Sequence, residues 1–149
     1  MATPVPPSTP QHAIIAGFGL PGRMVAETLD TQGVPYTVIE LNAETVSRLV
    51  KTGTRIVAGD VRDPAILSAA EILTASMLVL TVPDDLVVLA AIDQARKLNP
   101  SVKIVARCLY TSSGLEAAKR GAAQVVVAEQ LVAVEFSRIA ARLLASARD

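Results

Sequence analysis

Cysteine, histidine and aromatic residues are scarce in this sequence of 149 residues. A single cysteine excludes an intramolecular disulfide, and one cysteine with one histidine makes a zinc site built on them implausible. Aromatic residues make up 3% and tryptophan is absent, which argues against an aromatic platform for stacking bases. The net charge is zero, so a nucleic-acid binder that relies on a broad basic face is not expected.

Long apolar runs are missing as well. No stretch reaches the roughly 18 apolar residues that span a bilayer, and the N-terminus shows neither the positive region nor the apolar core of a secretory signal. Hydrophobic residues still make up 51% of the sequence and charged residues 19%, which excludes a disordered chain. This composition predicts a buried core, and it fits a parallel sheet covered on both faces.

Proline is concentrated at the start of the sequence. Residues 1–11 carry the prolines at positions 4, 6, 7 and 10 and lack a packing pattern, so we predict a tail or linker there and one folded domain over residues 12–149. Beyond the tail, short β-branched apolar runs alternate with segments of helical spacing. The predicted strands are residues 12–17, 36–40, 54–58, 77–82, 103–107 and 124–128. The predicted helices are residues 22–32, 43–51, 64–70, 84–98, 113–120 and 129–145.

Each predicted strand is followed by a helix, which is the pattern of repeated βαβ units. Right-handed crossovers between parallel strands then predict a Rossmann-like, doubly wound α/β fold. The expected sheet has six parallel strands in the order 3-2-1-4-5-6. In such a sheet, ligands bind beyond the carboxyl ends of the strands, at the point where the strand order reverses.

The motif GFGLPG, residues 17–22, follows the first predicted strand and leads into the first helix. This context is typical of dinucleotide binding, in which Gly17 permits the tight turn, Gly19 lets backbone approach a phosphate and Gly22 lets the helix pack on the strand. The helix N-terminus then directs free N–H groups at the phosphates. The alternative is a plain strand–turn–helix corner that needs glycine only for its geometry.

An acidic residue, Glu40, ends the second predicted strand about 20 residues after the glycine motif. A carboxylate at this place accepts hydrogen bonds from ribose hydroxyls and would repel a 2′-phosphate. Because no arginine follows directly, an unphosphorylated adenosine ribose is favoured over that of NADP. The alternative is a surface glutamate at a strand end.

Two acidic segments follow the third and fourth predicted strands at the same edge. Gly59 and Asp60 border the expected adenine pocket, where Asp60 could accept from the adenine amino group or serve as a turn residue that caps the next helix. Asp84 and Asp85 could in principle bind a cation. Such a pair more often lies in the first turn of a helix, stabilised by the macrodipole, and we favour this capping role.

Arginines supply the cations that could meet a phosphate. Arg107 ends the fifth predicted strand at the ligand edge, and Arg23 lies one residue into the first helix; the alternative for each is a solvated side chain.

His12 starts the first strand, at the wrong end of the sheet for chemistry, and is expected to be structural or exposed. Cys108 is expected to be a packed small residue.

In this order, the motifs resemble the RCK N-terminal domain, also called the KTN or Trk-regulator domain. The resemblance covers residues 12–145 and rests on GFGLPG, Glu40, Gly59-Asp60, Pro83-Asp84-Asp85, Ala106-Arg107 and the run KRGA with VVV at residues 119–127. It implies a cytoplasmic regulator of potassium channels, potassium uptake systems or cation–proton antiporters that binds NAD(H), AMP, ADP or ATP. It also implies a homodimer or ring of such domains, joined to a membrane cation transporter in the same or a separate chain.

The residues that the motifs and the resemblance together assign to the nucleotide are Gly17, Phe18, Gly19, Leu20, Pro21, Gly22, Arg23, Glu40, Leu41, Gly59, Asp60, Val61, Val82 and Arg107. No catalytic residue and no metal ligand is assigned. We therefore expect a non-catalytic sensor that gates potassium or other monovalent cation transport at the inner face of a membrane.

Two other functions remain open. An NAD-dependent oxidoreductase would need a substrate pocket and an acid–base group beside the nicotinamide, and few residues follow the sixth predicted strand. A scaffold with a vestigial nucleotide site would share the fold but gain no stability from any nucleotide. The last predicted helix carries more apolar surface than one sheet face needs, so we expect part of it to pack on a partner subunit.

Overall fold

The computed structural model describes residues 11–148. Residues 1–10, most of the predicted proline-rich tail, lie outside the described residues, as does residue 149. In the part of the chain that is described, no helix is both long and apolar enough to cross a membrane.

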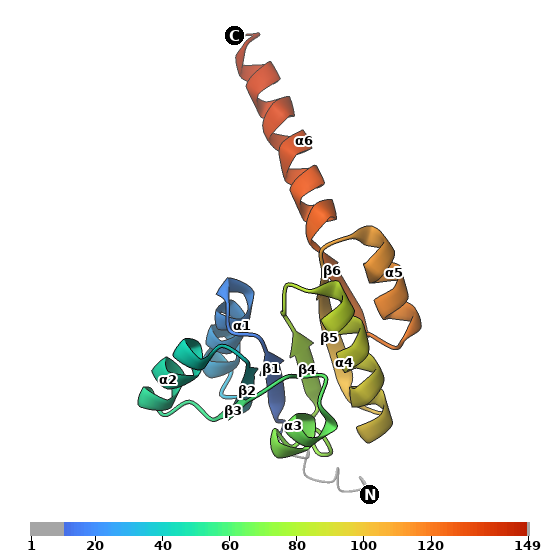
Figure 1. The fold of residues 1–149 in the computed structure, drawn as a ribbon. Helices are drawn as coiled ribbons and strands as arrows, with labels where there is room; N and C mark the ends of the chain where they lie inside the picture. Colours follow the sequence, from blue (N-terminus) through green and yellow to red (C-terminus); the bar gives the residue numbers. More distant parts are fainter. Residues whose placement is uncertain (1–10, 149) are drawn as a thin grey trace, which may run out of the picture.

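Parallel strands form one sheet in the order β3-β2-β1-β4-β5-β6 (Figure 1), which confirms the predicted Rossmann-like fold and strand order. The strands are β1 (Ala13–Ala16), β2 (Tyr36–Glu40), β3 (Ile56–Ala58), β4 (Met77–Leu80), β5 (Lys103–Cys108) and β6 (Gln124–Val127). The helices are α1 (Leu20–Thr31), α2 (Ala43–Lys51), α3 (Pro64–Ala69), α4 (Asp85–Leu98), α5 (Thr111–Lys119) and α6 (Ala128–Ser146).

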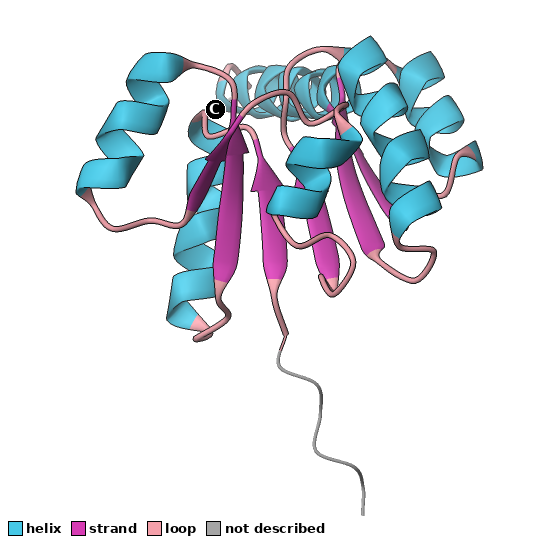
Figure 2. Cartoon of the chain, turned by 60° about the horizontal axis from the view of Figure 1, so that its bottom comes forward, coloured by secondary structure: helices cyan, strands magenta, loops and turns pink. Residues whose placement is uncertain are grey.

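The central strand, β1, pairs with both β2 and β4, and all of its residues are buried. Successive side chains of a strand point to opposite faces of the sheet. Ile14 and Ala16 join the core formed with α3, α4 and α5, whereas Ala13 and Ile15 pack with residues of α1. Because helices cover both faces (Figure 2), β1 needs an apolar residue at every position, which explains its uninterrupted apolar sequence.

Several element boundaries differ from the prediction by one or two residues. α1 begins at Leu20 rather than at residue 22, because Pro21 fits the first turn of a helix, where its missing N–H is not needed. β1 ends at Ala16, since Gly17 has a φ of 93° that no strand residue adopts. β3 begins at Ile56, β4 ends at Leu80, and α5 begins at Thr111. The second half of the glycine motif is therefore helix rather than loop.

The last helix, α6, extends away from the rest of the domain (Figure 1). None of its residues is buried by the described part of the chain. Its large exposed apolar side chains are Leu131, Val132, Val134, Phe136, Leu143 and Leu144. At the base of α6, an apolar groove of about 370 Å³ is lined by Leu131, by Val25 of α1, and by the strand residues Val79, Val105 and Val126. Among residues 11–148, no element covers this apolar surface of α6 and the adjoining groove.

His12 lies at the amino end of the sheet, opposite the expected ligand edge. Its Nε2 is 3.0 Å from Oγ1 of the buried Thr37, and its Nδ1 is buried without a hydrogen-bond partner among residues 11–148. Burial and then the charge of Arg55 lower the pKa of His12, and Glu71 offsets part of that shift. Cys108 is fully buried in the core, as predicted for a packed small residue. His12 thus lies away from the ligand edge, and Cys108, at the carboxyl end of β5, is enclosed by the core.

We expect the stability of the domain to fall as the pH drops from about 7.5 to 5.5. The unfolded chain takes up a proton near the ordinary histidine pKa of 6.5, while the folded state resists charging His12, so acid favours the unfolded state over this interval. Urea denaturation at several pH values measures the effect. A His12→Gln variant should lose most of this dependence, because His12 is the single histidine of the sequence. Stability that is constant or rises towards pH 5.5 would contradict the assignment.

Candidate functional site

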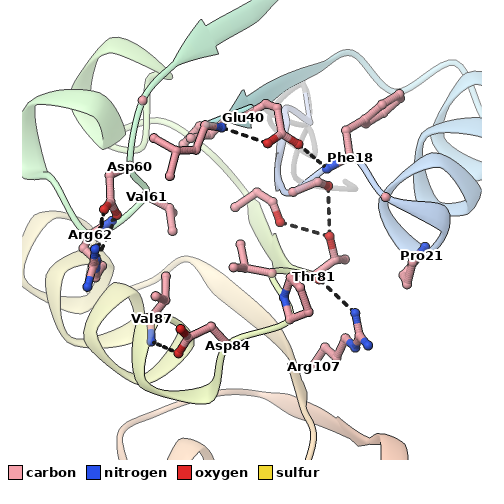
Figure 3. A pocket seen from close by; sticks show the side chains of 18 of the residues that line it. Phe18, Pro21, Glu40, Asp60, Val61, Arg62, Thr81, Asp84, Val87 and Arg107 are labelled. Carbon is pink, nitrogen blue, oxygen red and sulfur yellow. Dashed lines mark hydrogen bonds and ion pairs between the residues drawn. The ribbon is translucent and has the colours of Figure 1, made fainter. Parts of the chain in front are cut away.

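The carboxyl ends of the strands surround a pocket of about 520 Å³ (Figure 3). Its walls come from the segments that follow β1, β2, β3 and β4, together with the end of β5. It therefore lies where the strand order reverses between β1 and β4, as expected for a doubly wound sheet. The predicted residues that line it are Gly17, Phe18, Gly19, Leu20, Pro21, Glu40, Leu41, Gly59, Asp60, Val61, Val82 and Arg107.

Two predicted residues, Gly22 and Arg23, do not line this pocket. Gly22 is buried, and a Cβ there would collide with the carbonyl oxygen of Gly17, so the glycine serves the close packing of helix on strand. Arg23 lines a neighbouring cavity of about 490 Å³, which it shares with Glu40 and Arg48. Arg23 thus lies at the flank of the pocket rather than inside it.

The turn between β1 and α1 is built for backbone contact. At Gly17, φ is 93°, a conformation that favours glycine, and a Cβ would lie only 2.9 Å from Oγ1 of Thr81. A side chain there would therefore strain the backbone and also crowd Thr81. At Gly19, a Cβ would meet no atom of the described residues within 4 Å, which leaves open space above the backbone. Gly19 is also the N-cap of α1, where no described side chain accepts from the helix N–H groups. This end of α1 therefore presents its partial positive charge to the pocket.

Thr81 joins the end of β4 to this turn. Its Oγ1 is 3.0 Å from the carbonyl oxygen of Ala16 and 2.9 Å from that of Gly17, and its backbone N–H donates to Ala16 at 2.9 Å. Thr81 is almost fully buried. The hydroxyl therefore holds the glycine turn against β4 at a place where water has little access (Figure 3).

The Glu40 carboxylate connects the end of β2 to the glycine turn. One oxygen accepts from the N–H of Phe18 at 2.9 Å, and the other accepts from the N–H groups of Leu41 and Asn42, each at 2.9 Å. A carboxylate offers about four acceptor positions. Glu40 thus organises the backbone of the pocket and keeps capacity for about one further donor, such as a hydroxyl.

Asp60 is paired with Arg62, a pocket residue that the sequence analysis did not assign. The shortest contact, between Nη2 of Arg62 and Oδ2 of Asp60, is 2.6 Å. Hydrogen bonds from the Arg62 side chain and then from its backbone lower the pKa of Asp60. The alternative that Asp60 caps the next helix is wrong, because the N-cap of α3 is Asp63, which accepts from the N–H of Ala65 at 2.8 Å.

Asp84 and Asp85 have the structural roles that the sequence favoured. Asp84 is the N-cap of α4 and accepts from two backbone N–H groups at 3.0 and 3.2 Å. Asp85 accepts from the N–H of Leu109 at 2.8 Å, which ties α4 to the loop after β5. Burial alone would raise the pKa of Asp85, but hydrogen bonds from Ser113 and from the loop backbone outweigh it and lower the pKa. Over residues 11–148, no group of three or more His, Cys, Asp or Glu side chains could hold a metal ion.

Arg107 lies on the opposite side of the pocket from Arg62 (Figure 3). Its contact to the carbonyl oxygen of Thr81, at 3.4 Å, is long for a hydrogen bond. Arg107 also lines the apolar groove at the base of α6. A weakly held guanidinium at this position could turn towards an anionic ligand.

The TrkA-N domain family matches residues 13–128 of this chain. The chain belongs to the TrkA-N domain family. This finding confirms the resemblance drawn from the glycine motif, Glu40 and the later Asp and Gly segments. The match covers every strand of the sheet and the whole pocket.

The TrkA-N domain is similar to segments of longer proteins. YbaL of Escherichia coli, named as a cation/proton antiporter, is 32% identical over 87% of this chain and 23% of its own length. KefB of Alkalimonas amylolytica, named as a K(+) efflux antiporter, is 32% identical over 78% of this chain and 18% of its own length. This chain therefore spans about a fifth of the relatives it matches.

Solved structures share the fold. The crystal structure of the TrkA-N domain of YbaL superimposes with a TM-score of 0.82 at 30% identity, over 89% of this chain and 98% of that one. The Kef C-terminal domain of Shewanella denitrificans, solved with AMP bound, gives a TM-score of 0.78 at 25% identity, over 90% of this chain and 81% of that one. These two solved structures are thus a TrkA-N domain of an inner membrane protein and a Kef domain, and the Kef domain was solved with AMP.

Sequence reasoning missed Arg62 and Thr81 as parts of the pocket. Thr81 stands directly after a strand that faces the glycine motif, a place where a hydroxyl can reach the turn. Arg62 stands two residues after Asp60 in the same loop. This short spacing between opposite charges is the sequence feature that could have indicated their pairing. The sequence alone does not show that these contacts lie in the pocket, because that depends on the path of the backbone.

Replacing Thr81 by valine should destabilise the domain by about 1–3 kcal/mol. Valine keeps the shape of threonine but leaves the Gly17 carbonyl oxygen without its hydroxyl partner. A buried acceptor without a donor costs about 1–3 kcal/mol, and because this carbonyl is only part-buried, we expect the lower end of that range. Urea denaturation measures the change. Thr81→Ser is the control, because it keeps the hydroxyl and should lose only about 0.8 kcal/mol for the missing methyl. A valine variant as stable as the wild type would contradict the role of the hydroxyl.

Proposed function

We propose that this chain is a non-catalytic regulatory domain that binds an adenine nucleotide, AMP, ADP, ATP or NAD(H), and thereby gates cation transport by a membrane antiporter of the potassium-efflux type. The observation that carries the proposal is the pocket at the switch point of the sheet. There, the open end of α1 and the Glu40 carboxylate face one cavity. The similarity to YbaL, KefB and the AMP-bound Kef domain supports the nucleotide and the transporter.

Glu40 is proposed to bind the ribose. Its carboxylate has about one acceptor position left after the contacts to Phe18, Leu41 and Asn42, and a ribose hydroxyl can fill it. The negative charge disfavours a 2′-phosphate. Arg23 and Arg48, in the neighbouring cavity, are the side chains that could offset this charge, and binding of NADPH tests whether they do.

The phosphates are proposed to lie over Gly19 at the N-terminus of α1. The open space above Gly19 and the free helix end suit an anion, because N–H groups and the helix dipole both point at it. Arg107, across the pocket, would supply a second positive charge to a phosphate at this place.

An oxidoreductase is a weaker interpretation of the same pocket. Hydride transfer needs a group that can donate or accept a proton beside the reacting atoms. Among the described residues that line the pocket there is no His, Lys, Cys or Tyr. The carboxylates of Glu40, Asp60 and Asp84 are each held by hydrogen bonds within the fold. This chemistry supports binding rather than catalysis.

A thermal-shift panel with AMP, ADP, ATP, NAD, NADH and NADPH tests the site. A ligand at 100 times its Kd should stabilise the chain by about 2.7 kcal/mol, a rise in Tm of about 5–10 °C for a domain of this size. We expect a shift with at least one adenine nucleotide but not with NADPH. The shift should be lost in Glu40→Ala.

The matched control is Glu44→Ala, which removes an exposed carboxylate in the first turn of α2, outside the pocket. This variant should keep the shift. Absence of a shift with every nucleotide would leave a scaffold with a vestigial site, and turnover of NADH with a small substrate would revive the oxidoreductase.

We further infer that α6 packs on a second copy of this chain. The exposed apolar side chains of α6 form a surface that continues into the groove over Val79, Val105 and Val126. A hollow of about 390 Å³ on α6 itself is lined mainly by Leu131, Phe136 and neighbouring apolar residues. A paired arrangement would remove this surface from water, which is the main driving force for such association.

Phe136→Glu should weaken self-association at least about 10-fold, because buried aromatic anchors contribute most to such interfaces. Sedimentation velocity over a concentration series measures the change, and circular dichroism checks that the domain stays folded. Ser137→Glu adds the same charge one residue further along α6 and should have a smaller effect. A wild-type chain that remains monomeric at high concentration would contradict the inference.

A further inference from the structure

The carboxylate of Asp60 is engaged mainly by Arg62. Its Oδ1 accepts from the backbone N–H of Arg62 at 2.9 Å and from Nε at 3.0 Å, and its Oδ2 accepts from Nη2 at 2.6 Å and from Nε at 3.1 Å. Because Nε carries one hydrogen that the two oxygens share, three donor hydrogens reach a carboxylate that offers about four acceptor positions. Most of the acceptor capacity of Asp60 therefore serves Arg62 rather than a ligand.

The pairing instead fixes Arg62 at the edge of the pocket. A guanidinium held along one edge by a carboxylate is preorganised, and its flat faces stay free. The Arg62 side chain is 51% exposed, and it lines the same cavity as Val61 and Val82. The hydrogen bonds and charge of Asp60, and then the charge of Asp84, raise the pKa of Arg62, so the guanidinium stays protonated. In Figure 3, Arg62 lies beside Asp60 and away from Phe18, the aromatic residue of the lining.

We propose that Arg62 contacts the base of the bound nucleotide by stacking its guanidinium plane on the ring, and that Asp60 is a positioning residue that holds this plane. The inference rests on the proposed adenine-nucleotide site. Val61 and Val82 can contact a base only through methyl groups, whereas a guanidinium adds a cation–π attraction. A stacking contact reads the shape of a purine and not the amino group at its edge, so Asp60 does not distinguish adenine from hypoxanthine.

Affinities of AMP, IMP and adenosine, measured by NMR titration of the full chain, test the contact. Arg62→Lys keeps the charge but removes the plane and should weaken all three ligands by a similar factor of about 3- to 30-fold. Asp60→Asn should weaken them in the same way, because it releases the guanidinium. The double variant should be no weaker than the more affected single variant, since both changes remove one contact.

Arg55→Lys is the matched control. Arg55 also donates to a carboxylate, Glu71, at 3.0 Å with both side chains about half exposed, but neither residue lines the pocket. Its variant should leave all three affinities unchanged.

Three results would overturn this inference while leaving the proposed function intact. If Asp60→Asn weakens the binding of AMP but not that of IMP, Asp60 contacts the adenine amino group directly. If Arg62→Lys weakens the binding of AMP but not that of adenosine, Arg62 contacts the phosphate rather than the base. Wild-type affinities retained in Arg62→Lys, with binding still lost in Glu40→Ala, would remove Arg62 from the site. A wild-type chain that binds none of the three ligands, and that no nucleotide of the thermal-shift panel stabilises, would overturn the proposed function as well.

Discussion

The pocket depends on the contact between the Thr81 hydroxyl and the turn after β1. Three backbone segments meet there: the end of β1, the start of α1 and the end of β4. They approach so closely that neither Gly17 nor Gly22 has room for a Cβ. The hydroxyl lies within hydrogen-bond distance of the carbonyl oxygens of Ala16 and Gly17. The direction of α1, and with it the place where its free N–H groups point, follows from this contact.

Each carboxylate of the pocket accepts hydrogen bonds from the protein's own backbone or side chains. Glu40 gathers the N–H groups of two loops, Asp60 holds Arg62, and Asp84 caps α4. Groups held in this way lose little conformational freedom on binding, which favours affinity. Their negative charge is also spread over several donors, so an anionic ligand meets less repulsion than the count of acidic residues suggests.

The sequence predicted the fold closely because its signals are local. The apolar run of β1 and the alternation of short strands with helices depend only on residues near one another in the chain, and parallel topology has few alternatives. The glycine motif and Glu40 were found because their spacing is set by one βαβ unit. Thr81 was missed because its partners lie in a separate segment, the turn after β1. Arg62 was missed although its partner Asp60 is two residues away, because its place in the pocket depends on the path of their loop. Arg23 was assigned from its distance to the motif along the chain, but the turn of α1 directs it to the neighbouring cavity.

Arg107 borders two cavities, the pocket at the end of the sheet and the apolar groove at the base of α6. A side chain shared in this way cannot move for one cavity without changing the wall of the other. The two binding equilibria are then thermodynamically linked, and linkage is reciprocal. Any occupant of the pocket that repositions Arg107 alters the affinity of the groove, and an occupant of the groove alters the affinity of the pocket by the same factor.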